Sequence, residues 1–239
     1  MSELAEEMTR PARTTAGRRQ RPRDAATLIL IDRSGPTPKV LLGKRHHGHA
    51  FMPSKFVFPG GRVEAHDRRV PVAGQLDAHI EARLMRHVQR PSRDKARGFA
   101  VAAIREVFEE TGLLLGRKVE GADGAADPFA AAGVRPDLSE LHLIARAITP
   151  PGRPRRFDTR FFAADAQLIV HRVDGLVGPD AELVELTWLP VADAQKLDIP
   201  PVTKRVLSEL EARVAKGFGH ELPVPFYRVL HGKFTCVML

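Results

Sequence analysis

One short stretch near the middle of the chain, Arg105 to Leu113, constrains the fold most, because its charges and apolar residues are spaced for a helix. The stretch reads R-E-V-F-E-E-T-G-L. At 100° per residue, its arginine and three glutamates fall within a sector of about 140°, whereas its apolar residues gather on the opposite side. Gly112 is typical of the residue that ends a helix. We therefore expect an amphipathic helix with one buried apolar face and one acidic face.

The acidic face places three carboxylates where a helix tolerates them least. Glu106 lies three and four residues from Glu109 and Glu110, and each such like-charge pair destabilises an isolated helix by about 0.2–0.5 kcal/mol. All three also lie near the carboxyl end, where the helix dipole is negative. Arg105 offsets only part of this repulsion. A bound cation would offset the rest, and carboxylate oxygens suit Mg²⁺ or Mn²⁺, although a solvated charged face is the alternative.

A glycine loop upstream, Phe58-Pro59-Gly60-Gly61-Arg62, adds a second piece of pattern. Together the two pieces resemble the Nudix box, G-x5-E-x7-R-E-U-x-E-E-x-G-U, in which U is a bulky aliphatic residue. The second half matches at every fixed position, and the first half matches at Gly61, but Asp67 stands where the pattern has Glu. Residues 68 to 104 supply 37 positions where the pattern has 7, so 30 extra residues lie inside the box. A surface loop tolerates such growth, at about 0.6 kcal/mol per doubling of its length.

The resemblance implies an α+β protein with the Nudix fold, a mixed β-sheet sandwiched between α-helices. It implies an enzyme that hydrolyses the pyrophosphate bond in a nucleoside diphosphate linked to another moiety, with Mg²⁺ or Mn²⁺ as cofactor. Divalent metal shields phosphate oxygens, activates water and assists the leaving group in such reactions. The catalytic residues implied are Arg105, Glu106 and Glu109, and the metal ligands implied are the Gly60 carbonyl, Asp67, Glu106, Glu109, Glu110 and one later acid.

Two acids are candidates for that later ligand, Glu182 and Glu185, and we expect Glu185. The candidates for substrate binding are arginines, because guanidinium groups suit phosphate oxygens. One basic cluster, R-P-R-R, follows a T-P-P-G turn, although a solvated turn explains it equally well. The arginines that we expect to bind substrate are Arg45, Arg62, Arg156 and Arg160.

Within the family, the P-G-G loop, the insertion and the later T-P-P-G-R-P-R-R-F-D-T-R-F-F run look most like the acyl-coenzyme A diphosphatases. Coenzyme A or acyl-coenzyme A is therefore the leading substrate, with ADP-ribose, NADH, nucleotide sugars and nucleoside triphosphates as alternatives. A non-catalytic Nudix-like nucleotide-binding regulator is the rival class. The complete R-E-x-x-E-E-x-G run favours an enzyme, because binding alone would not require every acid. An aromatic content of 6% weighs against RNA bound by base stacking.

Length and composition predict a single domain over residues 25–239, with an insertion at about 68–98 and a disordered basic tail over 1–24. The net charge is +8, and the single Cys236 excludes an intramolecular disulfide, which is typical of a cytoplasmic protein. No apolar run approaches the roughly 18–20 residues of a membrane span. We expect a small-molecule nucleotide or coenzyme A partner and no membrane or nucleic acid, while a homodimer stays open.

Hydrophobic periodicity and turn residues predict the other elements. A loop with His46, His47 and His49 is expected to contact substrate or to have no role, since it lacks the acidic or Cys partners of a zinc site. Residues 226–237 are expected to form strand or irregular structure. The predicted strands are 26–31, 39–45, 55–58, 141–148, 156–164 and 183–189, and the predicted helices, besides the acidic one, are 75–90, 128–132 and 201–216.

Overall fold

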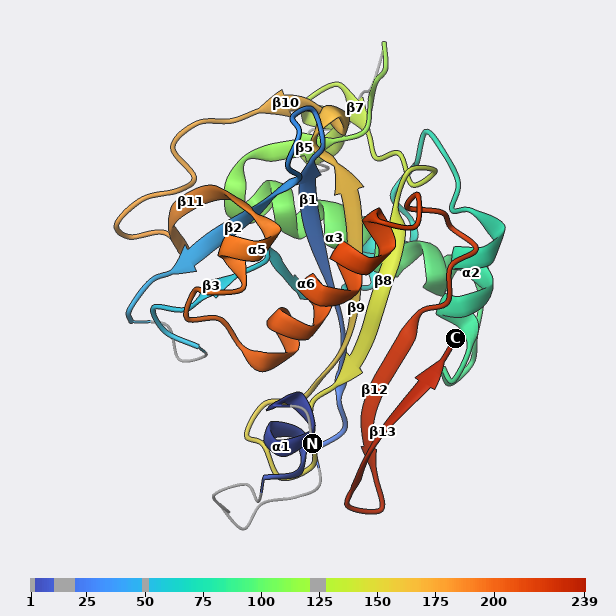
Figure 1. Cartoon of the computed structure of the whole chain (residues 1–239). Helices are drawn as coiled ribbons and strands as arrows, with labels where there is room; N and C mark the ends of the chain where they lie inside the picture. Colours follow the sequence, from blue (N-terminus) through green and yellow to red (C-terminus); the bar gives the residue numbers. More distant parts are fainter. Residues whose placement is uncertain (1–2, 11–19, 49–51, 121–127) are drawn as a thin grey trace.

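A mixed sheet runs through the middle of the computed structural model, which describes residues 3–10, 20–48, 52–120 and 128–239 (Figure 1). The strand order is β11-β2-β1-β9-β8-β12-β13, with β3 paired to β2 and β4 paired to β1. Two neighbouring pairs, β1 with β9 and β8 with β12, are parallel, and the other pairs are antiparallel. The bounds of these strands are β1 (Arg23–Asp32), β2 (Lys39–Arg45), β3 (Phe56–Val57), β4 (Gly60–Arg62), β8 (His142–Ile148), β9 (Phe157–Asp165), β11 (Leu183–Pro190), β12 (Pro225–Leu230) and β13 (Lys233–Met238).

Helices cover both faces of the sheet, which confirms the predicted sandwich. Successive side chains of β1 point to opposite faces, so Leu28 and Leu30 pack with one buried cluster and Ile29 and Ile31 with the other. The first cluster contains α2 (Ala78–Met85) and α3 (Arg93–Thr111), and the second contains α1 (Glu3–Thr9) and α6 (Pro201–Val214). No helix in the described part of the chain is long and apolar enough to cross a membrane.

The acidic helix α3 begins and ends at residues that satisfy its terminal groups. The Ser92 side chain accepts a hydrogen bond from the Lys95 amide at the first turn. Gly112 ends the helix as predicted, with a left-handed φ of 76°, and a Cβ there would lie 2.0 Å from the Val173 carbonyl oxygen. The apolar face, including Phe99 and Ile104, is fully buried against the sheet. Because the apolar face is buried, the opposite, acidic face of α3 is turned toward β4.

The insertion forms a shorter helix than predicted, because α2 ends at Met85 rather than near Arg90. The Asp77 carboxylate caps its first turn by accepting from the His79 amide, and the chain is already extended at Arg86. Ile80 and Leu84 bury the apolar stripe against α3 and its neighbours.

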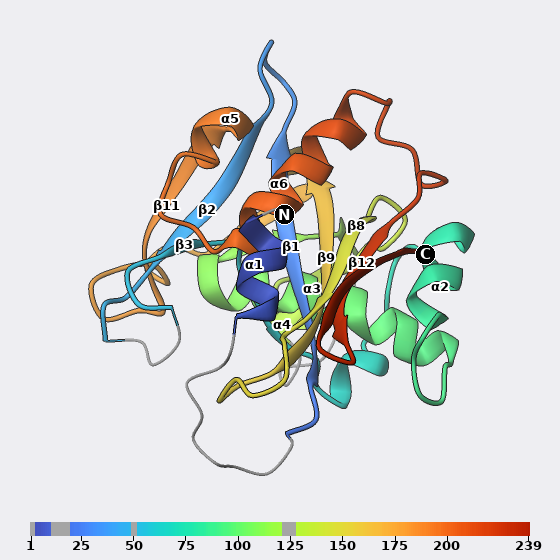
Figure 2. The ribbon, with the colours of Figure 1, turned by 60° about the horizontal axis from the view of Figure 1, so that its bottom comes forward.

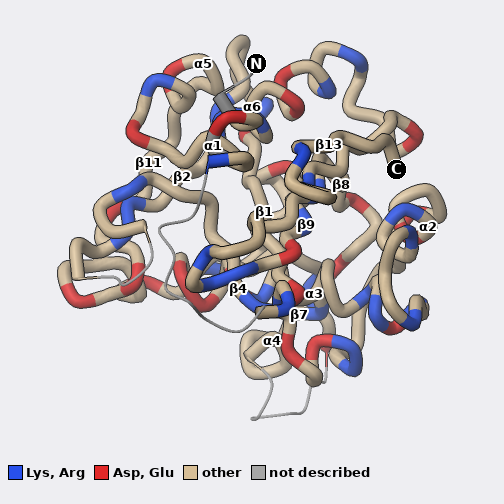
Figure 3. Tube along the Cα trace, turned by 90° about the horizontal axis from the view of Figure 1, so that it is seen from below, with Lys and Arg blue, Asp and Glu red and all other residues tan. Residues whose placement is uncertain are grey.

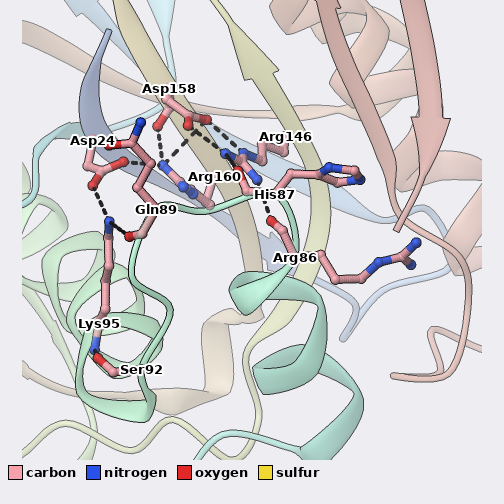
Figure 4. A network of polar contacts seen from close by, with 9 residues as sticks. All are labelled: Asp24, Arg86, His87, Gln89, Ser92, Lys95, Arg146, Asp158 and Arg160. Carbon is pink, nitrogen blue, oxygen red and sulfur yellow. Dashed lines mark hydrogen bonds and ion pairs between the residues drawn. The ribbon is translucent and has the colours of Figure 1, made fainter. Parts of the chain in front are cut away.

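The extended part of the insertion is held by an arginine of the sheet. The backbone carbonyls of Arg86 and His87 accept hydrogen bonds from the Arg146 guanidinium group, at 2.9 and 3.2 Å (Figure 4). Arg146 also donates to the Asp158 carboxylate on the neighbouring strand, at 2.7 and 2.6 Å. The insertion is therefore tied to the central sheet by buried polar contacts as well as by its apolar stripe.

The expectation of a disordered tail over residues 1–24 is wrong for residues 3–9, which form α1, and for residues 23 and 24, which open β1. Figure 2 shows α1 beside α6. Leu4 and Met8, four residues apart, are buried in the cluster that contains α6. This two-residue stripe is too short to show as periodicity in a polar segment, yet it finds a complementary surface in the folded chain. Residues 11–19 of the expected tail lie outside the described residues.

The remaining elements lie around this frame, and the predicted strands 141–148, 156–164 and 183–189 correspond to β8, β9 and β11. Residues 226–237 form the antiparallel β12–β13 hairpin. The smaller elements are β5 (Leu113–Leu115), β6 (Arg117–Lys118), β7 (Val134–Arg135), β10 (Ile169–Arg172), α4 (Pro128–Ala131), α5 (Val191–Ala194) and the short 3₁₀ turns η1 (His66–Arg68) and η2 (Ala166–Leu168).

Candidate active site

A pocket of about 430 Å³ opens between β1, β9, the glycine strand β4 and the carboxyl end of α3. Acidic and basic residues gather where β4 passes α3 (Figure 3). The apolar part of the lining comes partly from residues 52, 57 and 58 and partly from the start of α6, which the sequence did not suggest. The polar residues that line the pocket are Thr27, Arg45, Arg62, Glu64, Arg105, Glu106, Glu109, Glu110, Thr149, Arg155, Thr159, Glu182 and Thr203.

Arg105 is the centre of the charged network. It is 3% exposed, and its Nη1 donates to Glu106 Oε1 and Glu109 Oε2, both at 2.9 Å. Nη2 donates to the Arg62 carbonyl oxygen at 2.9 Å, which joins the helix to β4. Burial acts to lower the pKa of Arg105, but the hydrogen bond to Asp67 and the charges of the surrounding acids raise it overall. The guanidinium group stays charged and holds two of the acids in place.

Asp67 lies on the far side of Arg105 from the pocket and is fully buried. Its Oδ1 accepts from Arg105 Nε at 2.8 Å, and its Oδ2 accepts from Arg105 Nη2 at 3.2 Å and from the Glu64 amide at 2.7 Å. It does not line the pocket. The structure therefore does not support the expectation that Asp67 is an outer metal ligand, because both of its oxygens are committed to protein donors. It anchors Arg105 instead.

Glu110 has the most perturbed carboxylate of the site. Burial, and then the charge of Glu182, raise the pKa of Glu110 to about 9, although Arg45 and a hydrogen bond from the Gly60 amide act in the opposite direction. Burial also raises the pKa of Glu106, against the opposing effect of Arg105. Among the described residues, no hydrogen-bond donor contacts the buried Glu110 Oε2. A buried carboxylate oxygen without a donor is costly, and a cation would satisfy it.

The donor chemistry of these acids fits a hard divalent cation, which prefers carboxylate oxygens. As the side chains lie, no group of three Asp, Glu, His or Cys residues within the described ranges is gathered closely enough to hold an ion. Glu106 and Glu109 are each turned toward Arg105. The set can therefore supply ligands, although Arg105 engages two of its members in this structure.

The later acid in the pocket is Glu182 rather than Glu185. Glu182 precedes β11, lines the pocket and accepts a hydrogen bond from Arg45 Nη1 at 2.6 Å. Its charge acts on both Glu106 and Glu110. Glu185 is exposed on β11 and is not among the lining residues, so the structure corrects our choice between the two.

Of the four predicted substrate-binding arginines, Arg45 and Arg62 line the pocket and Arg156 and Arg160 do not. Strand alternation explains this, because Phe157, Thr159 and Phe161 of β9 face the pocket and the residues between them face away.

The two excluded arginines have structural contacts. Arg160 is 1% exposed and donates to Asp24 Oδ1 at 2.8 Å and to the Asp158 carbonyl at 2.7 Å (Figure 4). Arg156 Nε donates to the backbone carbonyls of residues 149 and 150. Sequence reasoning missed Arg155, which shares the basic R-P-R-R cluster and does line the pocket. Its place two residues before Phe157 was the signal that could have identified it.

The histidine loop does not contribute to the pocket as far as it is described. His46 and His47 are not lining residues, although the neighbouring Arg45 is. Their rings lie against each other, with centroids 4.2 Å apart. His49 lies outside the described residues. A substrate contact from this loop stays a prediction.

Comparison with known proteins finds similar chains among the Nudix hydrolases. The chain is 26% identical to a Caenorhabditis elegans protein that carries the name "Putative nudix hydrolase 7", over 75% of this chain and 57% of that protein. It is 29% identical to the acyl-coenzyme A diphosphatase NUDT19 of Gallus gallus, over 59% of this chain and 54% of that protein. The chain thus spans about half the length of the curated relatives that it matches.

A solved structure gives a further comparison. The crystal structure of a NUDIX hydrolase from Alicyclobacillus acidocaldarius matches with a TM-score of 0.58 and 29% identity, over 81% of this chain and 92% of that one. No family model matches the chain. These likenesses agree with the fold, a sheet between helices, and with the site, in which Arg105 holds acids of α3. The chain is thus similar to Nudix hydrolases in both sequence and fold.

Proposed function

We propose that the protein is a metal-dependent hydrolase that cleaves the pyrophosphate bond in a nucleoside diphosphate linked to another moiety. The observation that carries this proposal is the buried, unpartnered Glu110 Oε2 beside Glu106, Glu109 and Glu182 in one pocket. Such a group of acids repels a diphosphate unless cations lie between them. An acidic pocket that also presents arginines is therefore suited to a metal and an anionic substrate together.

Each residue of the network has a place in the proposed reaction. Glu106, Glu109 and Glu110 would hold Mg²⁺ or Mn²⁺, with the Gly60 carbonyl and Glu182 as further ligands. When bound, the metal would shield the diphosphate oxygens and lower the pKa of a water molecule. Glu106 or Glu182 would accept the proton of the attacking water. Arg105 keeps Glu106 and Glu109 on the pocket side through its Nη1.

Coenzyme A or acyl-coenzyme A is the substrate that we propose. It is supported by the name of the Gallus gallus relative, acyl-coenzyme A diphosphatase, and by the insertion inside the Nudix box. The pocket also offers an apolar side, lined by Met52, Phe157 and Val202, that suits the uncharged parts of such a molecule. ADP-ribose, NADH, nucleotide sugars and nucleoside triphosphates are the alternatives that an experiment must separate.

The test is product release from a panel of coenzyme A, acetyl-coenzyme A, ADP-ribose, NADH and nucleoside triphosphates, with and without Mg²⁺ or Mn²⁺, followed by mass spectrometry. We expect coenzyme A to yield 4′-phosphopantetheine and 3′,5′-ADP only with metal. Glu109→Gln should abolish this turnover. Glu185→Gln is the matched control, because Glu185 is an exposed acid outside the pocket. This variant should retain metal-dependent turnover.

The other outcomes are equally informative. Cleavage of another panel member would keep the reaction class and reject the proposed substrate. Full activity of Glu109→Gln would reject the assignment of the site. No turnover of any compound, together with tight binding of one of them, would favour a nucleotide-binding regulator.

A further inference from the structure

Three basic side chains gather around the buried ring of Phe226, on β12. The guanidinium carbons of Arg146 and Arg228 lie 4.2 and 4.8 Å from the centre of this ring, and the centre of the His87 ring lies 5.9 Å from it. His87 belongs to the insertion and Arg228 to β12, so the fold brings together residues that are far apart in the chain. None of these side chains lines the pocket of the candidate active site.

The backbone of the insertion directs two further cationic groups to this place. Arg146 holds the carbonyl oxygens of Arg86 and His87 by hydrogen bonds. His87 has a φ of 53°, a left-handed conformation that is uncommon for a residue with a Cβ. Figure 4 shows the Arg86 and His87 side chains pointing away from Asp158, toward β12 and β13. Both side chains are exposed and Arg228 is half-buried, so a ligand can reach them from solvent.

The charges in this cluster are not balanced by acids. Arg146 is paired with Asp158. Within the described part of the chain, the side chains of Arg86, His87 and Arg228 make no hydrogen bond or ion pair. Partial loss of solvent lowers the pKa of His87, and the charges of Arg228, Arg86 and Arg146 lower it further. The basic groups therefore repel one another, and an anion between them would relieve this repulsion.

The Arg228 guanidinium group lacks an acceptor on one of its edges. Its Nε atom is buried and has no hydrogen-bond partner among the described residues. The Phe226 ring attracts the charge of Arg228 but offers no acceptor oxygen. A buried donor without an acceptor is unfavourable. The Nε edge of a guanidinium group presents two parallel N–H groups, which suit the paired oxygens of a carboxylate or a phosphate.

The number of unbalanced charges favours a phosphate over a carboxylate. Arg86 and Arg228 each carry a full positive charge that no acid neutralises. His87 is neutral at pH 7, since its pKa lies below the ordinary value of 6.5, and a neutral imidazole donates one N–H. A phosphate group carries about −1.5 to −2 charges at this pH and has three acceptor oxygens. It therefore matches both the charge and the donors, whereas a carboxylate leaves one cation unbalanced.

We propose that Arg86, His87 and Arg228 form a site that binds the phosphate group of a soluble anion, separate from the pocket of the proposed hydrolase. Arg228 donates from its free Nε edge, and Arg86 and His87 complete the site from the insertion. A bound phosphate links the insertion to the β12–β13 hairpin, which no ion pair between Arg86, His87 or Arg228 and an acid does in the described structure.

The test is calorimetric titration of the metal-free protein with inorganic phosphate at pH 7 and constant ionic strength, followed by NMR of protein labelled in its histidine rings. We expect phosphate to bind and to shift the signal of His87. Arg228→Gln and Arg86→Gln should each weaken the affinity about tenfold or more. Because the Arg86 side chain is exposed and makes no contact that the fold requires, Arg86→Gln tests the site even if Arg228→Gln is unstable.

The matched control is Arg135→Gln, which removes an exposed strand arginine outside both the cluster and the pocket and should bind phosphate as the wild type does. Equal affinity of the wild type, Arg86→Gln and Arg228→Gln, or a His87 signal that does not move, would overturn the site. An equal shift with chloride would show only screening by salt and would also overturn it. These measurements require no turnover, so the site and the proposed hydrolysis can fail independently.

Discussion

At the scale of single residues, Glu110 shows how folding creates a site that is incomplete without a cation. The residue is 6% exposed, and one carboxylate oxygen has no donor in the described structure. The negative charges of Glu182 and Glu106 act on it. The fold therefore holds an energetically unfavourable group in place, which is typical of functional sites rather than of structural ones.

The raised pKa of Glu110 predicts how the metal-free protein responds to pH. Its pKa rises from 4.5 to about 9 on folding, so the folded state binds one proton more between these values. The stability contributed by the protonated group is complete below the lower value and is lost as pH rises to the higher one. We expect metal-free protein to lose up to about 1.4 kcal/mol per pH unit across this window. Glu110→Gln should remove this loss, as measured by denaturant unfolding in EDTA, and an unchanged slope would contradict the account.

The contact between Asp67 and Arg105 predicts a positioning role. Asp67→Asn weakens a buried ion pair, so we expect the free energy of unfolding to fall by about 3 kcal/mol. Because Arg105 then loses its anchor, kcat should also fall while KM changes little. Asp94→Asn, on the exposed first turn of the same helix, is the control for the loss of one acid. Steady-state kinetics measure kcat and KM of both variants, and a change confined to KM would argue against a positioning role for Asp67.

At the scale of elements, the alternation of β9 decides which side chains meet the substrate. The sequence showed a basic run followed by a strand, but it did not show which face of that strand would be buried. Arg160 fell on the face toward α3, where its Cζ lies 3.8 Å from the centre of the Phe99 ring. Arg155 fell on the pocket side. A shift of one residue in register would have exchanged these roles.

This alternation makes a prediction that separates the two arginines. Arg160→Gln removes a buried guanidinium group that donates to Asp24 and to the Asp158 carbonyl and packs on Phe99, so we expect unfolding to become easier by about 1–3 kcal/mol, with Lys95 still paired to Asp24. Arg155→Gln should change stability by no more than about 0.5 kcal/mol, because its side chain is exposed. Thermal and denaturant unfolding of the two variants check this. Comparable stabilities of the two variants would show that the buried network contributes little.

The end of the acidic helix was easier to predict than the strand faces. The 19-residue α3 ends in an apolar and acidic pattern followed by Gly112, so its end could be located at one residue, whereas its start at Ser92 was not predicted. The choice between Glu182 and Glu185 could not be made in this way, because it depends on the turn that enters β11. Asp67 was misjudged for a similar reason, since only the folded loop shows that it lies behind Arg105.

At the scale of the whole molecule, segments far apart in the chain pack on the two faces of the sheet. The insertion is fixed to β8 by Arg146, and α1 packs on the opposite face near α6. Arg83 of the insertion helix also donates to the backbone carbonyls of His220 and Glu221, in the segment between α6 and β12. The sequence indicated the mixed sheet between helices, but these long-range contacts depend on complementary surfaces that no local pattern reveals.

The packing of α1 predicts that the beginning of the chain contributes to stability and not to turnover. Leu4→Ala and Met8→Ala each remove a buried apolar side chain, so we expect a loss of up to about 1.5–3 kcal/mol per substitution. Turnover below the unfolding temperature should be unchanged, because neither residue lines the pocket. Glu6→Gln, an exposed change on the same helix, should have no effect on either property. Wild-type stability in both alanine variants would mean that α1 does not hold this position in solution.

The most direct test of the central claim is calorimetric titration of the metal-free protein with Mn²⁺, because it does not depend on the choice of substrate. We predict that the wild type binds Mn²⁺ and that Glu110→Gln weakens the affinity at least about tenfold through loss of a charged ligand. Glu185→Gln, outside the pocket, should bind as the wild type does. Equal affinity of the wild type and Glu110→Gln, or no binding to either, would contradict the assignment of the acids of α3 as a metal site.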